Sequence, residues 1–424
     1  MGYNTKFKIF NYPNYNRNKK YIIKPCLPMS SNKFYDDLVK TVKETAEDCE
    51  IYRSRCAEVE YDFDAPLNDT TLGEIPYIPW SLFKQSINKF KDLLRGDTFD
   101  KLDFWMESSS TCGDPSIVGR LESDIEVLKE NYNDVFNSFS VKDQVNNLIL
   151  FAPNIRFINK IKHNFYDKNA YLLYKSIVDI WEGKKVHYLL QFFAWKSIWN
   201  LMTTFKPKAV IGINGKLLES ELDRVEKNKI PTIMANSPLW MHKVLLDFYK
   251  AKNRTFDLSE NFNIITGGGG WEGTKGRIKL GYKVEKPEFI EQMCDMFNIT
   301  TDKFCDNFAA TESPLACGGH WSKKYNDFIL HVDNNKGRLA LRNMDTLEPI
   351  KKTGEPGILE FITPYGVDSY AGVAVLLDDI VQVENWNECP ECGRQGAIFR
   401  VMGRLTPSIG KGCSSLFSLD AYKV

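Results

Sequence analysis

A short stretch in the last third of the chain combines a carboxylate with two side chains that can bind metals. Glu312 follows the apolar, small-residue run Phe-Ala-Ala-Thr, and Cys317 and His320 come a few residues later. A carboxylate in such a setting can hold Mg²⁺ beside a phosphate group. The alternative is an exposed acid at a helix start, without a chemical role. We expect the rest of the chain to be arranged around this stretch.

A second pair of thiols has the spacing of a zinc knuckle. Cys389 and Cys392 form a Cys-x-x-Cys motif followed by glycine, so both thiolates can bind one tetrahedral ion. Zinc requires two further ligands, and Cys317 and His320 supply a second pair. We therefore predict a structural zinc site of three cysteines and one histidine. Redox use of the motif is the alternative, although no thioredoxin-like setting surrounds it.

Two upstream loops have compositions that suit a nucleotide. Residues 108–115 combine hydroxyl groups with a glycine, and their backbone N–H groups could surround phosphate oxygens. The loop is not a Walker loop, because the spacing differs and no lysine follows the glycine. The glycine run at 267–270 would let the backbone approach a flat ligand, which Trp271 could cover. A serine-rich surface turn and a flexible hairpin are the respective alternatives.

Three residues near the C-terminal end of the sequence could also take part in chemistry. Asp379 is expected to end an apolar strand, where a carboxylate often binds a sugar hydroxyl or a metal. Arg404 follows another apolar strand, and Cys413 lies between glycine and serine. A thiol beside glycine and lysine would be accessible and electropositive, as an acyl-accepting thiolate needs to be. The alternatives are a solvated acid and an ordinary tail residue.

The periodicity of the chain predicts the elements that position these residues. Residues 33–56 have the pattern of one or two amphipathic helices. Strand-like and helical segments then alternate, which predicts an α/β core with a largely parallel sheet, followed by a smaller β-rich subdomain. The predicted strands are 147–152, 209–213, 232–235, 263–266, 328–332, 339–342, 357–362, 371–377 and 397–401, and the predicted helices are 171–181, 188–203, 216–228 and 239–251.

Composition limits the classes of protein that fit. Of the 424 residues 43% are hydrophobic, so a large core is possible, and Lys+Arg equals Asp+Glu at 55 each. A balanced charge argues against a dedicated nucleic-acid binder. The sequence contains no apolar run long enough for a membrane span and no signal-peptide pattern, so we expect a cytoplasmic protein. Its ten cysteines should then be reduced, bound to metal or catalytic.

The motifs, in their order along the chain, resemble those of the adenylate-forming enzymes. Within these enzymes they resemble the phenylacetate–CoA ligase branch, and most closely the acyl-protein synthetases. The likeness runs from about residue 75 to the end. Residues 75–84 are similar to the family's entry segment. Residues 108–115 stand where the family has Ser-Ser-Gly-Thr-Thr-Gly-x-Pro, and 308–312 where it has Tyr-Gly-Met-Thr-Glu. The phosphate loop departs from that pattern at Ser110, Cys112 and Asp114.

The resemblance implies ligands for ATP, Mg²⁺ and zinc. The residues are Ser108, Ser109, Thr111 and Gly113 for the phosphates; Gly268, Gly269 and Gly270 for adenine; Asp379 for the ribose; Phe308 and Arg404 elsewhere in the ATP site; Thr311 and Glu312 for phosphate and Mg²⁺; and Cys317, His320, Cys389 and Cys392 for zinc, where zinc-bearing relatives carry theirs.

The resemblance also implies the reaction. We predict ATP-dependent activation of a carboxylic acid, of fatty-acid type, as acyl-AMP, with transfer of the acyl group to a thiol. CoA ligases continue beyond this point with a mobile lid domain, whereas acyl-protein synthetases end shortly after an acyl-accepting cysteine, a position that Cys413 matches. The alternatives are an external acceptor, either CoA or a carrier protein, and a degenerate nucleotide-binding module without catalysis. A reductase partner is implied by the resemblance alone.

The predicted organisation has four parts. An N-terminal helical or irregular extension (1–74) precedes an α/β adenylation core (75–325), a β-rich subdomain (326–404) and a short tail (405–424). The walls of the acid pocket are expected from 195–203 and 237–246. In this arrangement the zinc site would hold Glu312 in place relative to Asp379.

Overall fold

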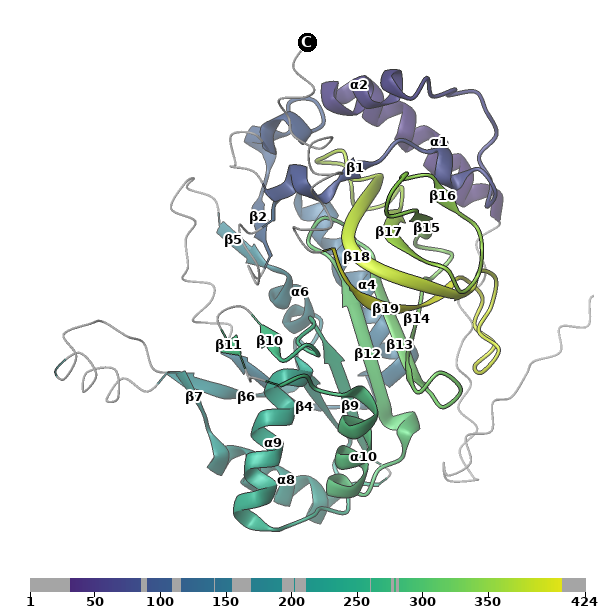
Figure 1. The fold of residues 1–424 in the computed structure, drawn as a ribbon. Helices are drawn as coiled ribbons and strands as arrows, with labels where there is room; N and C mark the ends of the chain where they lie inside the picture. The colour runs from purple at the N-terminus through teal and green to yellow at the C-terminus, as the bar shows by residue number, and fades with distance from the viewer. Residues whose placement is uncertain are drawn as a thin grey trace, which may run out of the picture.

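A computed structural model describes residues 31–84, 90–108, 116–140, 142–154, 169–192, 202, 211–259, 261–275, 278–279 and 282–405. Within these residues a 14-stranded sheet has the order β16-β15-β17-β18-β19-β14-β13-β12-β9-β8-β4-β6-β7, with β1 paired to β18. In Figure 1, helices α8, α9 and α10 lie at one end of the molecule, and α1 and α2 lie beside the β-rich strands at the other. The predicted α/β class is confirmed.

One half of the large sheet is mostly parallel. Strands β12, β9, β8, β4 and β6 pair in parallel, and β7 joins β6 in the antiparallel sense. Their bounds are β4 (Asn147–Pro153), β6 (Lys185–Phe192), β7 (Ile211–Ile213), β8 (Thr232–Asn236), β9 (Phe262–Gly267) and β12 (Phe304–Ala309). β8 and β9 are buried along almost their whole length, as expected for parallel strands with both faces covered.

The other half is antiparallel. Its strands are β13 (Ala316–Ser322), β14 (Asp327–His331), β15 (Arg338–Arg342), β16 (Pro349–Ile350), β17 (Pro356–Ile362), β18 (Ala374–Asn385) and β19 (Ile398–Arg404). β13 pairs with β14, so the sheet is continuous across the predicted boundary at residue 325. The short strand β1 (Ile78–Pro79) adds in parallel to β18 and brings the entry segment to this half.

Helices and a small second sheet complete the described chain. The helices are α1 (Ser31–Asp48), α2 (Glu50–Glu58), α4 (Glu122–Ser140), α6 (Leu173–Asp179), α8 (Gly215–Asn228), α9 (Pro238–Lys252) and α10 (Lys286–Phe297). β2 (Phe104–Glu107), β3 (Ile117–Arg120) and β5 (Asn169–Leu172) form the three-stranded sheet, and β10 (Thr274–Lys275) pairs with β11 (Ile278–Lys279). Among the described residues, no helix is long and apolar enough to cross a membrane.

Two predictions of local structure were wrong. The helix predicted over 188–203 begins instead as strand β6, since a short apolar run fits either period and the parallel sheet decides. The helix predicted over 171–181 starts later, because β5 extends to Leu172 and α6 follows it. The segments that form β12 and β13 were not predicted as strands, although they flank Glu312 and contain Cys317 and His320.

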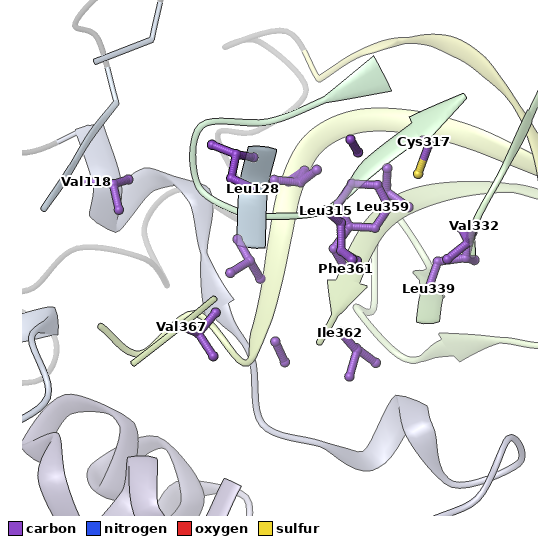
Figure 2. Packing of buried hydrophobic residues seen from close by; sticks show 14 of the residues in the cluster. Val118, Leu128, Leu315, Cys317, Val332, Leu339, Leu359, Phe361, Ile362 and Val367 are labelled. Carbon is purple, nitrogen blue, oxygen red and sulfur yellow. The ribbon is translucent and has the colours of Figure 1, made fainter. Parts of the chain in front are cut away.

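A hydrophobic core joins the segment after Glu312 to several elements that are distant in the sequence. Figure 2 shows Leu315 and Cys317 close to Leu359 and Phe361 of β17, with Leu128 of α4 nearby. The Leu359 and Phe361 side chains are fully buried. This packing gives the β12–β13 connection a fixed support.

Candidate active site and metal centre

Glu312 lies in the turn between β12 and β13, and its carboxylate contacts Ser116, the residue that follows the predicted phosphate loop. Glu312 is buried, and it accepts a hydrogen bond from the hydroxyl of Ser116. The Ser116 N–H donates to Ser108 Oγ at 2.8 Å, and the Ser108 N–H donates to the Ser116 carbonyl at 2.9 Å. Both ends of the predicted phosphate loop are therefore joined beside Glu312. The loop residues Ser109, Ser110, Thr111, Cys112, Gly113 and Asp114 lie outside the described residues, as does Cys413.

Two more carboxylates and two cations lie near Glu312. Arg404 Nε is 3.0 Å from Asp379 Oδ1 and 3.9 Å from Asp378 Oδ1, and Lys84 Nζ is 3.2 Å from Asp378 Oδ2. Burial raises the pKa of Asp379 to about 6; Arg404 opposes this shift, and Asp378 and Glu312 add to it. Burial also raises the pKa of Glu312, against the hydrogen bond from Ser116. The group therefore has excess negative charge, which suits a metal cation.

The prediction that Asp379 ends a strand was wrong. β18 starts at Ala374 and continues to Asn385, so the carboxylate lies within the strand. Asp379 pairs with Arg404 across β18 and β19, and the register shifts just beyond this pair, between Ile380 and Val381. Such an irregularity within a strand changes the direction of the neighbouring side chains. The side chain of Asp379 is nearly buried, whereas that of Arg404 is 56% exposed.

Lys84 has no assigned role in the sequence prediction. It follows β1, and the parallel pairing of β1 with β18 carries it to Asp378, 294 residues away in the chain. Its ammonium nitrogen also lies 4.2 Å from the centre of the Trp80 ring. A contact at this separation leaves no periodic signal in the sequence, so only the fold identifies it.

The glycine run adopts a backbone conformation that favours glycine. Gly268, Gly269 and Gly270 have φ values of 70°, 70° and 109°. The Ser237 hydroxyl donates to the Gly269 carbonyl at 2.7 Å, and a Cβ on Gly270 would lie 2.8 Å from that hydroxyl oxygen. The predicted cover, Trp271, packs in a hydrophobic cluster with Phe289 and Phe328.

Two other predicted nucleotide residues take part in packing or backbone contacts. The Phe308 ring contacts Phe361 and Phe399, with ring centres 6.0 and 6.2 Å apart. Thr311 is buried, and its carbonyl accepts a hydrogen bond from Arg120 at 3.0 Å.

A cluster of two histidines and two cysteines lies beside the paired strands β13 and β14. One ligand atom from each of His320, His331, Cys389 and Cys392 can be chosen so that all lie within 4.8 Å of one another. His320 Nε2 is 3.5 Å from Cys389 Sγ, and His331 Nε2 is 3.9 Å from Cys392 Sγ. Tetrahedral binding with bonds near 2.3 Å to sulfur and 2.0 Å to nitrogen requires sulfur–nitrogen separations of about 3.5 Å. The four side chains fit such an ion.

The environment of the two imidazoles agrees with this fit. His320 Nδ1 lies 3.2 Å from the Trp321 carbonyl, which leaves Nε2 directed at the thiols. His331 Nδ1 is buried and has no hydrogen-bond partner among the described residues. The hydrogen bond from Cys389 is the main cause that lowers the pKa of Cys392, and the two imidazoles contribute. A thiolate beside two imidazoles is a donor set that favours zinc.

Cys317 does not belong to this cluster, contrary to the prediction from the sequence. Cys317 and His320 are three residues apart on the continuous strand β13, so their side chains point to opposite faces. Cys317 faces the hydrophobic core, and burial raises the pKa of its thiol. His331 takes its place, because it pairs with Gly318 and therefore shares a face with His320. The Cys-x-x-His spacing suits a metal-binding turn, but here it lies in a strand.

Comparison with models of protein families identifies the family of this chain. A family model described as "Acyl-protein synthetase, LuxE" matches residues 29–421. The chain belongs to the acyl-protein synthetase family. The match extends well upstream of residue 75, where the motif likeness begins. It supports assignment of the chain as an acid–thiol ligase of the adenylate-forming type. No curated protein matches the chain significantly.

Solved structures show that this acyl-protein synthetase has a ligase fold. An open conformation of 2-hydroxyisobutyryl-CoA ligase in complex with 2-HIB-AMP and CoA is similar at 12% identity, with a TM-score of 0.57 over 89% of this chain and 76% of that one. The same ligase in its thioesterification state gives a TM-score of 0.56 at 12% identity, over 94% of this chain and 76% of that one. These likenesses confirm the fold predicted for an adenylate-forming enzyme.

Proposed function

We propose that this acyl-protein synthetase activates a fatty acid with ATP and transfers the acyl group to its own Cys413. The observation that carries the proposal is the hydrogen bond from Ser116 to Glu312. It joins the end of the phosphate loop to a buried carboxylate, with Asp378 and Asp379 close by. With these residues we propose backbone that binds phosphate, a carboxylate that binds the cation and a carboxylate that binds the ribose.

The first step forms an acyl-phosphate anhydride. A carboxylate oxygen of the acid attacks the α-phosphorus of ATP, and the bond to the bridging oxygen of pyrophosphate breaks. Mg²⁺ bound at Glu312 would neutralise charge on the phosphate oxygens. Backbone N–H groups of the loop at 108–115 would hold the phosphates, and Asp379 would accept hydrogen bonds from the ribose hydroxyls. Protein groups act here mainly by positioning and charge neutralisation.

Lys84 adds a cation to the same site. Its ammonium group forms an ion pair with Asp378. Its positive charge also partly opposes the rise in the pKa of Glu312 that burial causes. We assign it to the phosphates of ATP, because an ammonium group close to Glu312 and Asp378 would attract the anionic oxygens of a nucleotide bound there.

The second step moves the acyl group. The Cys413 thiolate attacks the acyl carbonyl carbon, the carbon–oxygen bond to AMP breaks, and AMP leaves with the electron pair. Two alternatives lack this step: in one, an external thiol on CoA or a carrier protein accepts the acyl group, and in the other, the module binds nucleotide without catalysis. A reductase that consumes the acyl group is the partner that the family resemblance implies.

Replacement of the acceptor thiol separates these alternatives. In Cys413→Ser, labelled fatty acid should no longer be retained covalently by the protein, while acid-dependent exchange of pyrophosphate into ATP continues. Cys294→Ser, at a partly buried cysteine of α10, is the matched control and should retain the label. Unchanged labelling of Cys413→Ser would exclude Cys413 as the acceptor.

The cluster of His320, His331, Cys389 and Cys392 is proposed to hold a structural zinc ion. Bound there, zinc would connect the β13–β14 pair to the segment between β18 and β19, which carry Asp379 and Arg404. The donor set has four protein ligands and leaves no position open for substrate, as is typical of structural zinc sites. Zinc analysis of the purified protein should give about one ion per chain, and Cys389→Ser should lose it.

A further inference from the structure

A buried arginine contacts the backbone of the turn that carries Glu312. Arg120 is fully buried, and its guanidinium donates to the carbonyls of Thr311 and Gly366, at 3.0 and 3.1 Å, and to the Tyr370 hydroxyl at 3.1 Å. In the described part of the chain, its hydrogen-bond acceptors are thus two carbonyls and a phenol. A buried cation is costly unless polar groups surround it. Its location at this turn therefore calls for a reason other than simple packing.

Tyr370 makes the neighbouring contact. Its hydroxyl donates to the Glu312 carbonyl at 2.8 Å, and the Arg120 guanidinium lies 4.9 Å from its ring centre. The ring also packs against Phe83 and Phe90. Burial raises the pKa of Tyr370 to about 12, so the hydroxyl remains a donor at neutral pH. Two consecutive carbonyls, those of Thr311 and Glu312, are held in this way.

The same short strand also holds the Glu312 side chain. Arg120 is the last residue of β3, and Ser116, which donates to the Glu312 carboxylate, immediately precedes that strand. Glu312 is therefore fixed at its backbone through Arg120 and Tyr370 and at its carboxylate through Ser116. Hydrogen bonds to a carboxylate and to the backbone that carries it set the direction of its oxygens.

We infer that Arg120 and Tyr370 are positioning residues that direct the Glu312 carboxylate at the divalent cation of the nucleotide complex. The inference rests on the proposed function, in which Glu312 binds that cation. Because both side chains are fully buried and hold the turn that carries Glu312, replacing either should change the cation dependence of nucleotide binding and kcat. The affinity for the acid should not change.

Tyr370→Phe tests this inference by removing one hydroxyl and keeping the ring. We expect the apparent Mg²⁺ midpoint for ATP binding, measured by calorimetry, to rise several-fold. We expect kcat of acid-dependent pyrophosphate exchange to fall roughly tenfold, since small misplacements of catalytic groups have effects of this size. KM for the acid should stay within twofold. Tyr52→Phe is the control, because its buried hydroxyl has no hydrogen-bond partner among the described residues.

The outcomes separate failure of the inference from failure of the proposed function. A Tyr370→Phe protein with a lower Tm but wild-type Mg²⁺ midpoint and kcat would make the residue merely structural and overturn the inference. Wild-type protein that binds ATP without any Mg²⁺ dependence would overturn both. Should Tyr370→Phe fail to fold, Arg120→Lys decides, since lysine keeps the charge but lacks the planar fork, and the same shifts are expected.

Discussion

The two ends of β13 differ in the way their polar groups are held. Before the strand, Glu312 lies among two other carboxylates, Lys84 and Arg404, and part of this group is exposed. Farther along the strand, roughly 13 Å beyond its first residue at His320, two imidazoles and two thiols surround one point. The first region has more carboxylates than cations and is partly open to solvent. The second has four side chains that can bind a metal, directed at one another. From this difference we propose a chemical role for the first region and a structural role for the second.

Both regions depend on the same pair of strands, and this links them physically. β18 and β19 carry Asp379 and Arg404, and the segment between these strands carries Cys389 and Cys392. An ion bound by the cysteines and histidines would therefore restrict the strands that carry Asp379 and Arg404. We therefore expect changes in the first region to lower activity with little effect on folding, and changes in the second to lower stability with less effect on activity.

Loss of the Glu312 carboxylate should have the largest effect on activity. Glu312→Gln keeps the size of the side chain but removes the charge that would bind Mg²⁺. We expect acid-dependent pyrophosphate exchange to fall roughly 100-fold or more, with thermal unfolding close to that of the wild type. Glu348→Gln, at an exposed acid, is the matched control. Exchange that remains within a few-fold in Glu312→Gln would remove this residue from the chemistry.

Metal content should separate His331 from Cys317. We expect His331→Ala to lose the bound zinc and to lower Tm by several degrees, and Cys317→Ala to keep the zinc, because Cys317 faces the core. Elemental analysis and thermal unfolding measure both effects. The ligand set described here is wrong if Cys317→Ala loses the metal while His331→Ala retains it.

Removal of the Lys84 charge should weaken nucleotide binding more than chemistry. Lys84→Met is expected to raise KM for ATP roughly tenfold, which corresponds to about 1.4 kcal/mol of binding free energy, with a smaller change in kcat. Lys40→Met removes a surface lysine of helix α1 as a control. An unchanged KM for ATP would show that Lys84 acts on Asp378 alone.

The smallest expected effect is a pH dependence from Asp379. Its raised pKa of about 6 means that the carboxyl takes up a proton as the pH falls through that value, and a protonated carboxyl is a weaker acceptor for ribose hydroxyls. Ionisation alone predicts that kcat/KM for ATP falls about fourfold from pH about 7.5 to about 5.5. Asp379→Asn should show lower kcat/KM without this decline. The same decline in the variant would assign it to another group.

The sequence predicted the residue types of the site better than their geometry. Glu312, Asp379 and Arg404 could be selected because they lie in motifs whose order resembles a family, and their positions agree with a shared site. The Cys317 assignment failed because a Cys-x-x-His spacing has a different meaning in a strand than in a turn. His331 carried no local signal, since pairing of β13 with β14 alone brings it to the cluster.

Contacts between distant segments could not be predicted from the sequence. Arg120 reaches Gly366 across 246 residues, and Lys84 reaches Asp378 across 294. Such contacts depend on the pairing of β1 with β18 and on the packing of β3 against later loops, which local periodicity does not encode. The helix predicted over 188–203 failed for a related reason, because burial in a parallel sheet decided its conformation.

The reaction proposed for the region around Glu312 is activation of a carboxylic acid with ATP. Exchange of labelled pyrophosphate into ATP, measured with the purified full chain and a panel of short- to long-chain fatty acids, tests this most directly. We predict exchange that depends on Mg²⁺ and on at least one acid of the panel, and that is lost in Glu312→Gln. Folded protein that shows no acid-dependent exchange with any member of the panel would contradict the account.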